Sequence, residues 1–334
     1  MLEIWAELGI CLAVIAVAGT KLSRYGDIIA SKTGMTGNWI GLILMATVTS
    51  LPELATGLSA VTIGDAPNIA VGDLLGSCVF NLLLLALIDI VRRERPFYSE
   101  ISDSHGLTAA FGIALIGIVG VGLTSAPLPG ARAFGHVGII TPLLIVGYGY
   151  AMWVVFVRER VANSEGTGEL IDRYPETTLR TALSRYAIAA VFVVGAGIWL
   201  PFIGRDLAIA MGWSTSFVGT LLIAAITSAP ELVVSMSAVR IGAIDMAAGN
   251  LLGSNLFNML VLAIDDLAFV KGPILAEVDS VHANSAFTAA IMAAIVTAAL
   301  LARPQRRFRG VPGVPSIALM AAYLVNGWAL YAGG

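Results

Sequence analysis

Long apolar stretches separated by short polar breaks run through the whole chain. The pattern predicts ten segments of membrane-spanning length, at residues 4–21, 37–61, 67–91, 106–124, 136–157, 183–203, 214–239, 246–270, 283–302 and 314–331. Each is close to the 20 or so apolar residues that one helical crossing of a bilayer requires. We therefore expect an all-α polytopic membrane protein with ten transmembrane helices.

The composition agrees with this pattern. The chain has 334 residues, of which 57% are hydrophobic and 12% are charged, and its mean hydropathy is +0.87. Soluble domains carry about twice this density of charge. The composition excludes a soluble enzyme, a nucleic-acid-binding module and a disordered chain. Cys11 and Cys78 both lie in apolar stretches, which argues against a disulfide framework.

The distribution of basic residues predicts the orientation in the membrane. Sixteen of the 19 Lys and Arg residues fall in alternate loops, and only Arg132, Arg205 and Lys271 fall in the others. Cytoplasmic loops carry an excess of basic residues, so both termini are predicted to be extracytoplasmic. The polar stretch at 158–182 is then a cytoplasmic linker, too short for a folded domain. We expect a multi-pass protein of a prokaryotic plasma (inner) membrane.

The first residues do not have the pattern of a cleaved signal peptide. The segment before the apolar stretch contains Glu3 and Glu7 and no Lys or Arg, whereas a signal peptide begins with a basic region.

An internal repeat relates the two halves of the chain. Residues 49–54, TSLPEL, match 227–232, TSAPEL, and residues 72–81, GDLLGSCVFN, match 249–258, GNLLGSNLFN. The repeat predicts a first five-helix unit at 1–157 and a second at 183–334. Because five is odd, the second unit enters the membrane in the opposite sense, which gives an inverted repeat typical of secondary transporters. The alternative is a duplication retained only for helix packing.

The acidic residues inside the predicted spans are the main candidates for function. Glu53 and Glu231 occupy matched positions in the repeat, and Asp73 lies on the following span, whereas no Lys or Arg lies in the middle of any predicted span. An ionised carboxylate at the centre of a bilayer costs on the order of 3 kcal/mol. We expect these carboxylates to be neutralised by a metal ion, by a proton, or by both in turn.

The residues around the glutamates favour a cation site. Pro52 and Pro230 precede the glutamates and free the carbonyls of Val48 and Ile226, which predicts broken helices whose carbonyls can coordinate ions. The remaining oxygen donors are Thr49, Ser50, Thr227 and Ser228 beside the breaks, with Asp73, Ser77 and Asn81 on one helix face and Asn250, Ser254 and Asn258 on another. An all-oxygen set suits a hard cation such as Ca²⁺. The alternative for each isolated Ser, Thr or Asn is a hydrogen bond to its own backbone or to a neighbouring helix.

Other ionisable residues have simpler interpretations. Asp89 precedes Arg92 and Arg93 at the end of a span and is expected to form a surface ion pair, and Asp265 and Asp266 are interpreted in the same way. The three histidines, His105, His136 and His282, lie at predicted helix starts and are expected at the membrane interface. His105 and His282 are related by the repeat, so a role in proton handling stays open.

The two repeated blocks resemble the alpha repeats of the calcium/cation antiporter superfamily, which includes the sodium/calcium exchangers. The resemblance covers essentially the whole chain. It implies an antiporter that exchanges Ca²⁺ for Na⁺ or H⁺, with Glu53 and Glu231 as central ligands and with Thr49, Thr227, Ser77, Ser254, Asn81 and Asn258 completing the Ca²⁺ and flanking Na⁺ sites. The implied ligands are these transported ions alone, without a further cofactor or a nucleic-acid partner, and a monomer suffices for function.

The sequence departs from the superfamily pattern at several positions. Val48 and Ile226 stand where glycine is frequent, Asp73 and Cys78 replace asparagines, and Asn258 stands where some sodium-coupled members have aspartate. These departures leave the coupling ion and the stoichiometry open.

We expect alternating access, because the glutamates must be neutralised whenever they cross the membrane interior. The rival hypotheses are a Na⁺/H⁺ or other divalent-cation exchanger of the same fold and, in a different class, a cation channel. A membrane-embedded hydrolase is disfavoured, because no Ser-His, HExxH or paired-aspartate motif is present in suitable spans.

Overall fold

The structure is a computed structural model that describes residues 2–92, 96–125, 133–165, 174–211, 223–303 and 313–333. The first half contains α1 (Leu2–Thr33), α2 (Gly37–Trp39), the π-helical η1 (Ile40–Met45), α3 (Ala46–Thr49), α4 (Leu51–Thr62), α5 (Pro67–Val91), α6 (Phe97–Glu100), α7 (Ser104–Ser125), the strands β1 (Ala133–Phe134) and β2 (Val137–Gly138), and α8 (Ile140–Glu165). The second half contains α9 (Leu179–Met211), α11 (Ala224–Thr227), α12 (Ala229–Arg240), α13 (Ile244–Ala268), the 3₁₀ helix η3 (Ile274–Ala276), α14 (His282–Ala302) and α15 (Val314–Gly333).

The helical stretches agree with the predicted spans. Within the described ranges, nine helical stretches are long and apolar enough to cross a membrane. Residues 214–222 of the remaining predicted span, 214–239, lie outside the described residues, and most of its other residues form α11 and α12. An all-helical membrane protein is therefore confirmed. The two strands, paired with Ala133 opposite Gly138, form only a short hairpin before α8.

Two helices are longer than their apolar stretches. The predicted span 4–21 lies within α1, which continues to Thr33, and 183–203 lies within α9, which begins at Leu179. The last turns of α1 continue because Ile28 and Ile29 are buried in a cluster that also contains residues of η1 and α13. The predicted linker 158–182 is correspondingly shorter, since α8 runs to Glu165 and α9 takes up its last residues.

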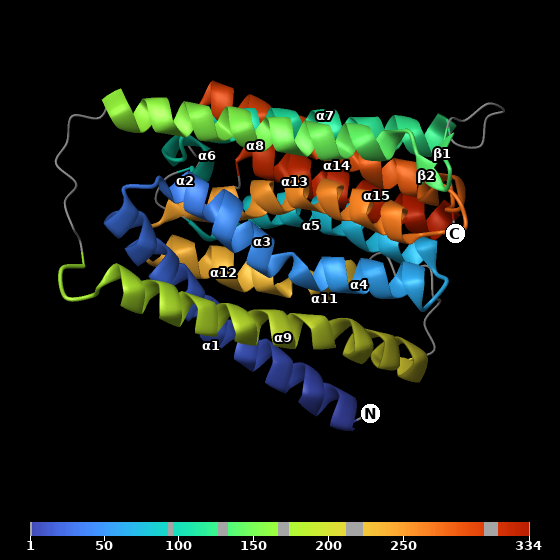
Figure 1. Ribbon diagram of the computed structural model, residues 1–334, viewed down its shortest axis with the longest axis horizontal. Coiled ribbons are helices and arrows are strands. Elements are labelled where there is room, and N and C mark those ends of the chain that lie inside the picture. The colour runs from blue at the N-terminus through green and yellow to red at the C-terminus, as the bar shows by residue number, and fades with distance from the viewer. Residues whose placement is uncertain are drawn as a thin grey trace.

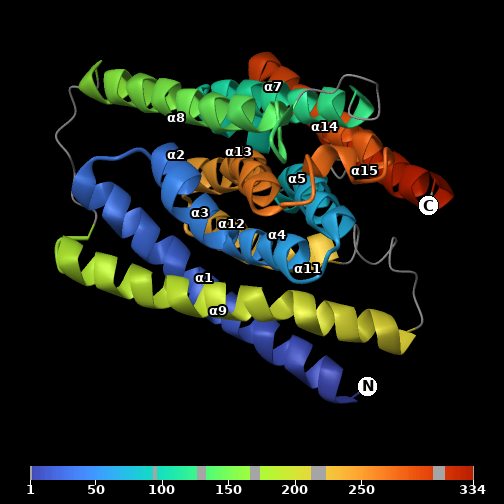
Figure 2. The same cartoon turned by 45° about the vertical axis from the view of Figure 1, so that its right-hand side comes forward.

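The helices form three layers (Figures 1 and 2). The middle layer contains α2 to α5 of the first half and α11 to α13 of the second. The long helices α1 and α9 pack together on one side of it, and they run in opposite directions. On the other side lie α7, α8, α14 and α15. Both termini lie at the same end of the molecule, and the other end, where α1 ends and α9 begins, is called the linker end below.

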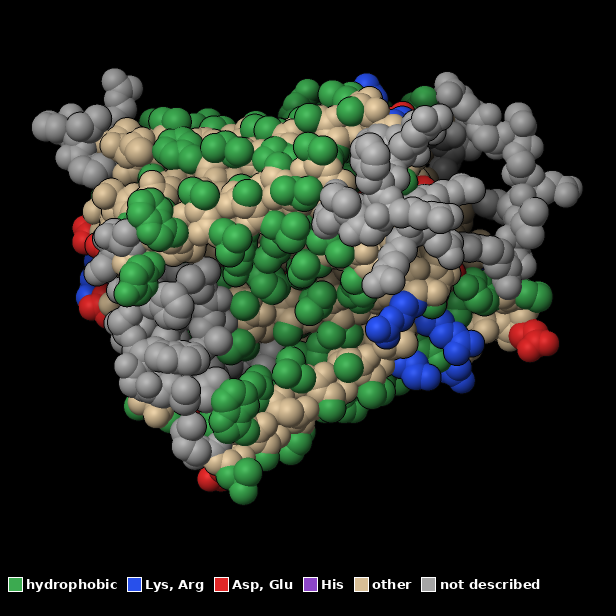
Figure 3. Space-filling model, turned by 180° about the vertical axis from the view of Figure 1, so that it is seen from behind, with side chains coloured by type: hydrophobic (Ala, Val, Ile, Leu, Met, Phe, Trp, Pro, Cys, Tyr) green, Lys and Arg blue, Asp and Glu red, His purple; other side chains and the backbone are tan. Residues whose placement is uncertain are grey.

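The surface has the distribution of a membrane protein. Hydrophobic side chains are spread over the visible face between the two ends, and the largest group of Lys and Arg side chains lies toward the linker end (Figure 3). Many large hydrophobic side chains are exposed on α1, α8, α9 and α15. In water such a surface would be unfavourable, and in lipid it is expected.

Close backbone contacts hold α2 and η1 against α13. A Cβ atom on Gly41 would lie 2.3 Å from the carbonyl oxygen of Met246, and one on Gly249 would lie 2.6 Å from that of Asn38. Small residues allow this approach, as is common between membrane helices. The packing sets the register between α3, which carries Thr49, and α13, which carries Asn250 and Ser254.

The expectation that three aspartates lie at the surface was wrong. Asp89, Asp265 and Asp266 are all buried, with at most 2% of their surface exposed. Asp89 accepts hydrogen bonds from the Phe97 amide (2.8 Å) and from Ser316 Oγ (2.5 Å). Burial arises because α15 covers the end of α5, a contact between residues more than 220 positions apart that the local sequence does not reveal.

Asp266, which matches Asp89 in the repeat, forms the corresponding hydrogen bonds in the second half, and these two sets of contacts are called the aspartate clamps below. It accepts hydrogen bonds from the Ile274 amide (2.6 Å), the Gly138 amide (2.9 Å) and the hydroxyl of Thr141. Each aspartate thus fixes the loop after its own core helix and holds the last helix of the other half. In contrast, neither carboxylate oxygen of buried Asp265 has a hydrogen-bond partner among the described residues.

Two histidines form a further pair of related contacts. His105 Nε2 lies 3.0 Å from Asp245 Oδ1, and His282 Nε2 lies 3.0 Å from Asn68 Oδ1. Both imidazoles are buried in the protein, because each packs against the start of a core helix in the other half. His136 is half-buried, and its Nε2 lies 3.2 Å from the Leu267 carbonyl oxygen.

The glycine packing can be tested by adding one methyl group. Gly41→Ala is expected to destabilise the protein by about 1–3 kcal/mol, because the new Cβ would overlap the backbone of α13. Gly112→Ala in α7 is the matched control, since its Cβ would meet no other atom within 4 Å. Thermal unfolding of the purified variants measures both. Equal unfolding temperatures for the two variants would contradict the close packing.

Adjacent aspartates give a second matched pair. Asp266→Asn is expected to lower stability by about 1–3 kcal/mol, because both carboxylate oxygens accept hydrogen bonds and an amide can accept on only one side. Asp265→Asn is expected to keep or raise the unfolding temperature, because it removes a buried carboxylate that has no donor among the described residues. A larger loss at position 265 than at 266 would show that Asp265 has a stabilising partner.

Candidate cation site

The site is built at two interruptions in helices of the middle layer. Ser50 (φ −93°, ψ 8°) separates α3 from α4, and Ser228 (φ −80°, ψ 7°) separates α11 from α12. The interruptions precede Pro52 and Pro230, as the sequence predicted, because a proline ring excludes the carbonyl four residues earlier from its helical hydrogen bond. Each proline then lies in the first turn of the next helix, where its missing amide proton costs nothing.

Both glutamates lie directly after these interruptions and are completely buried. Glu53 is in the first turn of α4, and Glu231 is in the first turn of α12. The amino-terminal end of a helix carries a partial positive charge that stabilises a carboxylate. The interruption therefore creates, in the interior of the protein, the place where an acidic side chain is best tolerated.

Each glutamate accepts hydrogen bonds from both halves of the chain. Glu53 Oε1 accepts from Ser77 Oγ of its own half and from Ser228 Oγ of the other, both at 3.4 Å. Glu231 Oε1 accepts from Ser254 Oγ of its own half at 3.3 Å and from Ser50 Oγ of the other at 3.0 Å. The serine of each interruption thus supports the glutamate of the opposite repeat.

Asp73 and Asn250 occupy equivalent positions and differ in charge. Thr227 Oγ1 donates to Asp73 Oδ1 at 2.9 Å, and Thr49 Oγ1 donates to Asn250 Oδ1 at 3.2 Å. Asp73 is completely buried, and Thr227 Oγ1 also lies 3.5 Å from the hydroxyl of Ser77, which donates to Glu53. The structure therefore brings the third carboxylate into the same network as the two glutamates.

Asparagines extend the network on α5 and α13. Asn81 Nδ2 donates to Asn255 Oδ1 at 3.1 Å, and Asn258 Nδ2 donates to the Leu74 carbonyl at 3.5 Å. Asn255 also donates to the Cys78 carbonyl at 3.2 Å. Asn255 was not among the ligands expected from the sequence, because it lies off the face shared by Asn250, Ser254 and Asn258. The position of Asn255 within the repeated block, where it matches Cys78, was the signal in the sequence that could have identified it.

The twelve residues that the sequence offers as oxygen ligands are all at most 1% exposed. Among the described residues, five of their oxygens are buried without a hydrogen-bond partner: Glu53 Oε2, Glu231 Oε2, Asp73 Oδ2, Asn81 Oδ1 and Asn258 Oδ1. All five are carboxylate or amide oxygens, so the protein leaves acceptors unsatisfied here. Buried acceptors without donors are costly unless a cation or a proton neutralises them.

Acidic side chains alone do not form a metal cage here. Within the described ranges, no three His, Cys, Asp or Glu side chains lie close enough together to hold a metal ion. A cation bound at this site would therefore need hydroxyl, amide and backbone oxygens as well. Ca²⁺ accepts such mixed oxygen ligands in flexible geometry, whereas Zn²⁺ prefers nitrogen and sulfur.

Comparison with known proteins identifies the family. A sequence model described as "Sodium/calcium exchanger protein" matches residues 4–157 and 181–331, which is most of both halves. The chain belongs to the sodium/calcium exchanger family. The family assignment makes the protein a multi-pass membrane protein and a cation antiporter, not an enzyme.

Individual relatives agree with this assignment. The chain is 27% identical over 269 residues to the inner membrane protein YrbG of Escherichia coli, covering 78% of each chain. It is 26% identical over 272 residues to the sodium/calcium exchanger MaX1 of Methanosarcina acetivorans, covering 72% of this chain and 76% of that one. The solved structure of the sodium-calcium exchanger NCX_Mj matches 97% of both chains with a TM-score of 0.72 at 20% identity, which shows a shared fold.

Proposed function

We propose that this exchanger-family protein carries Ca²⁺ in exchange for Na⁺ or H⁺, with Glu53 and Glu231 as the central ligands. The observation that carries the proposal is the set of five unpartnered acceptor oxygens in the network around the interrupted helices. We assign the hydroxyls of Thr49, Ser50, Thr227, Ser228, Ser77 and Ser254, the carboxylate of Asp73, and the amide oxygens of Asn81 and Asn258 to the same ion-binding region. Ca²⁺ is favoured because oxygen is the ligand it requires.

The proposed architecture is an inverted repeat. Residues 1–157 form one five-helix unit and 183–334 the other, joined by the segment 158–182. The opposite directions of α1 and α9 support the inversion. So do the matched hydrogen bonds of Glu53 and Glu231. With the charge distribution in the loops, the linker end is the cytoplasmic end and both termini are extracytoplasmic.

The proposed mechanism is alternating access with obligatory exchange. Among the described residues, no basic side chain forms a hydrogen bond to these carboxylates. Without a bound cation, it would therefore be energetically costly to move the site across the membrane interior. The site changes its orientation only when Ca²⁺ or the coupled Na⁺ or H⁺ neutralises it. Because both cations use the same carboxylates, binding of one displaces the other.

The rival functions differ in what drives the flux. A Na⁺/H⁺ exchanger or an exchanger of another divalent cation would use the same fold and the same carboxylates. A cation channel would need no counter-ion gradient. Similarity to MaX1, which is described as a sodium/calcium exchanger, favours exchange of Ca²⁺ and Na⁺.

Reconstituted vesicles provide the test of the glutamates. Uptake of radioactive calcium should depend on an outward sodium or proton gradient, and Glu53→Gln or Glu231→Gln should reduce it at least 100-fold, because each change removes a central charge. Glu277→Gln makes the same chemical change at an exposed position and should leave uptake unchanged.

The outcomes separate the hypotheses. Uptake that persists without either gradient would indicate a channel, and sodium–proton exchange without calcium uptake would indicate the rival exchanger. Substantial calcium uptake by folded Glu53→Gln and Glu231→Gln proteins would refute the ligand assignment.

Asp73 provides a separate test of the third charge. Asp73→Asn keeps an acceptor for the Thr227 hydroxyl, so the protein should fold, but it should raise the Ca²⁺ concentration needed for half-maximal thermal stabilisation about tenfold or more. The double variant Asp73→Asn/Asn250→Asp moves the charge to the repeat-related position and should recover part of the affinity. An unchanged Ca²⁺ requirement in Asp73→Asn would place Asp73 outside the ion site.

A further inference from the structure

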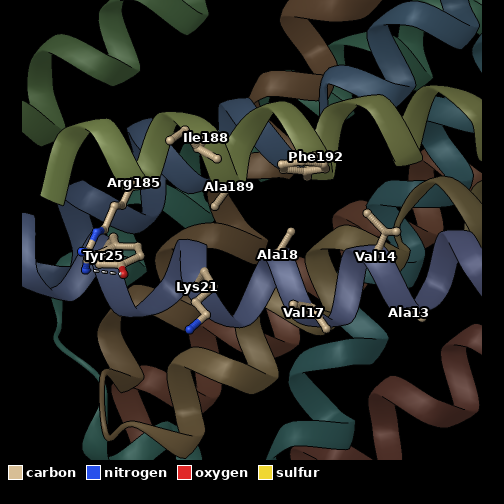
Figure 4. A pocket seen from close by; sticks show the side chains of 10 residues that line it. All are labelled: Ala13, Val14, Val17, Ala18, Lys21, Tyr25, Arg185, Ile188, Ala189 and Phe192. Atoms are coloured by element: carbon tan, nitrogen blue, oxygen red, sulfur yellow. Dashed lines mark hydrogen bonds between the residues drawn. The ribbon is translucent and has the colours of Figure 1, made fainter. Parts of the chain in front are cut away.

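A groove lies between α1 and α9 on the outside of the helix bundle. Figure 4 shows its lining, and its volume is about 590 Å³. Along most of its length the walls are apolar, with Val14 and Val17 from α1 facing Ile188 and Phe192 from α9. Val17, Ile188 and Phe192 are each more than half exposed. The groove is therefore an open hydrophobic surface formed by two membrane-spanning helices.

One end of the groove is basic. Lys21 and Arg185 line it together with Tyr25, and in Figure 4 all three lie at the same end. Arg185 Nη1 donates to the Tyr25 hydroxyl at 3.2 Å, and the guanidinium carbon lies 5.8 Å from the centre of the tyrosine ring. Neither Lys21 nor Arg185 forms an ion pair with an acidic residue among those the structure describes. Tyr25 thus holds the Arg185 guanidinium over the groove while both charges stay available.

The basic end coincides with the end of the apolar surface on both helices. The apolar span of α1 ends at Lys21, and that of α9 begins at residue 183, next to Arg185. Both charges therefore lie where the hydrocarbon of the bilayer meets the headgroups. An occupant of the groove has an apolar part along the helices and an anionic group at the interface.

We propose that the groove binds one anionic phospholipid. An acyl chain lies along Val14, Val17 and Phe192, and the headgroup phosphate lies between Lys21 and Arg185. Ammonium and guanidinium groups form charge-assisted hydrogen bonds with phosphate oxygens. A zwitterionic lipid carries its own ammonium group, so two unpaired cations favour a lipid with net negative charge.

The groove is connected to the cation site through α9. A Cβ atom on Gly197 would lie 2.3 Å from Cγ of Pro52, the residue before Glu53. On the other wall, Ser23 of α1 donates to the Val234 carbonyl of α12 at 2.8 Å. A lipid that spans α1 and α9 therefore touches the two helices that pack on both interrupted helices. Its effect on exchange rests on the proposed function, whereas its binding does not.

Lipid retention by the purified full-length protein tests the proposal. The protein in detergent is mixed with phosphatidylglycerol and phosphatidylcholine in equal amounts, and bound lipid is counted by native mass spectrometry. We expect one retained phosphatidylglycerol per chain with a preference of roughly tenfold or more over phosphatidylcholine. Lys21→Gln/Arg185→Gln should abolish the preference. Equal retention of the two lipids by the unmodified protein would overturn the proposal.

Two further variants separate groove binding from general surface charge. Ala13→Trp fills the apolar end of the groove and leaves both cations in place, so it should also lose the retained lipid. Arg24→Gln removes an exposed charge of α1 that does not line the groove, so this variant should keep the bound lipid. If Arg24→Gln lost as much lipid as the double variant, the lipid would be attracted to the charged surface in general. Full retention by Ala13→Trp would show that the lipid does not lie in the groove. Either result would overturn the proposal.

An exchange measurement forms an independent arm. In vesicles of phosphatidylcholine with and without phosphatidylglycerol, the anionic lipid should change the rate of calcium exchange at least twofold for the unmodified protein and not for Lys21→Gln/Arg185→Gln. Retention is measured without any ion gradient, so absence of calcium exchange would count against the proposed function and leave the lipid site standing. Retention without any rate effect would overturn the link to the cation site.

Discussion

A carboxylate buried in a membrane protein must be neutralised, and the middle layer of this structure is organised around that requirement. Glu53 and Glu231 lie at helix starts created by the interruptions at Ser50 and Ser228, where the backbone dipoles favour negative charge. Serine hydroxyls from both halves bond one oxygen of each carboxylate, and the second oxygen has no donor among the described residues. Under the proposed function, a bound cation compensates the charges that the protein positions here.

The hydrogen bonds of the two glutamates also connect the two halves. Ser50 of the first half supports Glu231 of the second, and Ser228 supports Glu53. The aspartate clamps at the helix ends cross between the halves in the same way, with Asp89 holding α15 and Asp266 holding α8. Within the site, the two halves differ by one charge, since Asp73 carries a carboxylate where Asn250 carries an amide.

Much of this arrangement could be predicted from the sequence, because it depends on local rules. Apolar stretches set the spans, the repeated blocks matched Glu53 to Glu231, and the prolines located the interruptions. The prediction failed where distant contacts decide burial. Asp89 beside Arg92 has the pattern of a helix end in solvent, and only the packing of α15 buries it. The length of α1 was missed for the same reason, since its last turns are polar in part but pack on η1 and α13.

The long helices show how the halves differ. Gly197 of α9 lies against Pro52, beside Glu53, whereas its repeat partner Gly19 of α1 lies against Val233, one turn after Pro230. α1 and α9 therefore contact the interrupted helices of the opposite halves at different levels. Under the inverted-repeat proposal, each half takes on the arrangement of the other half when the site opens to the opposite side of the membrane. Gly19 would then lie at Pro230, and Gly197 would lie near Ala55. A displacement of about one helical turn along the interrupted helices would then separate the two states.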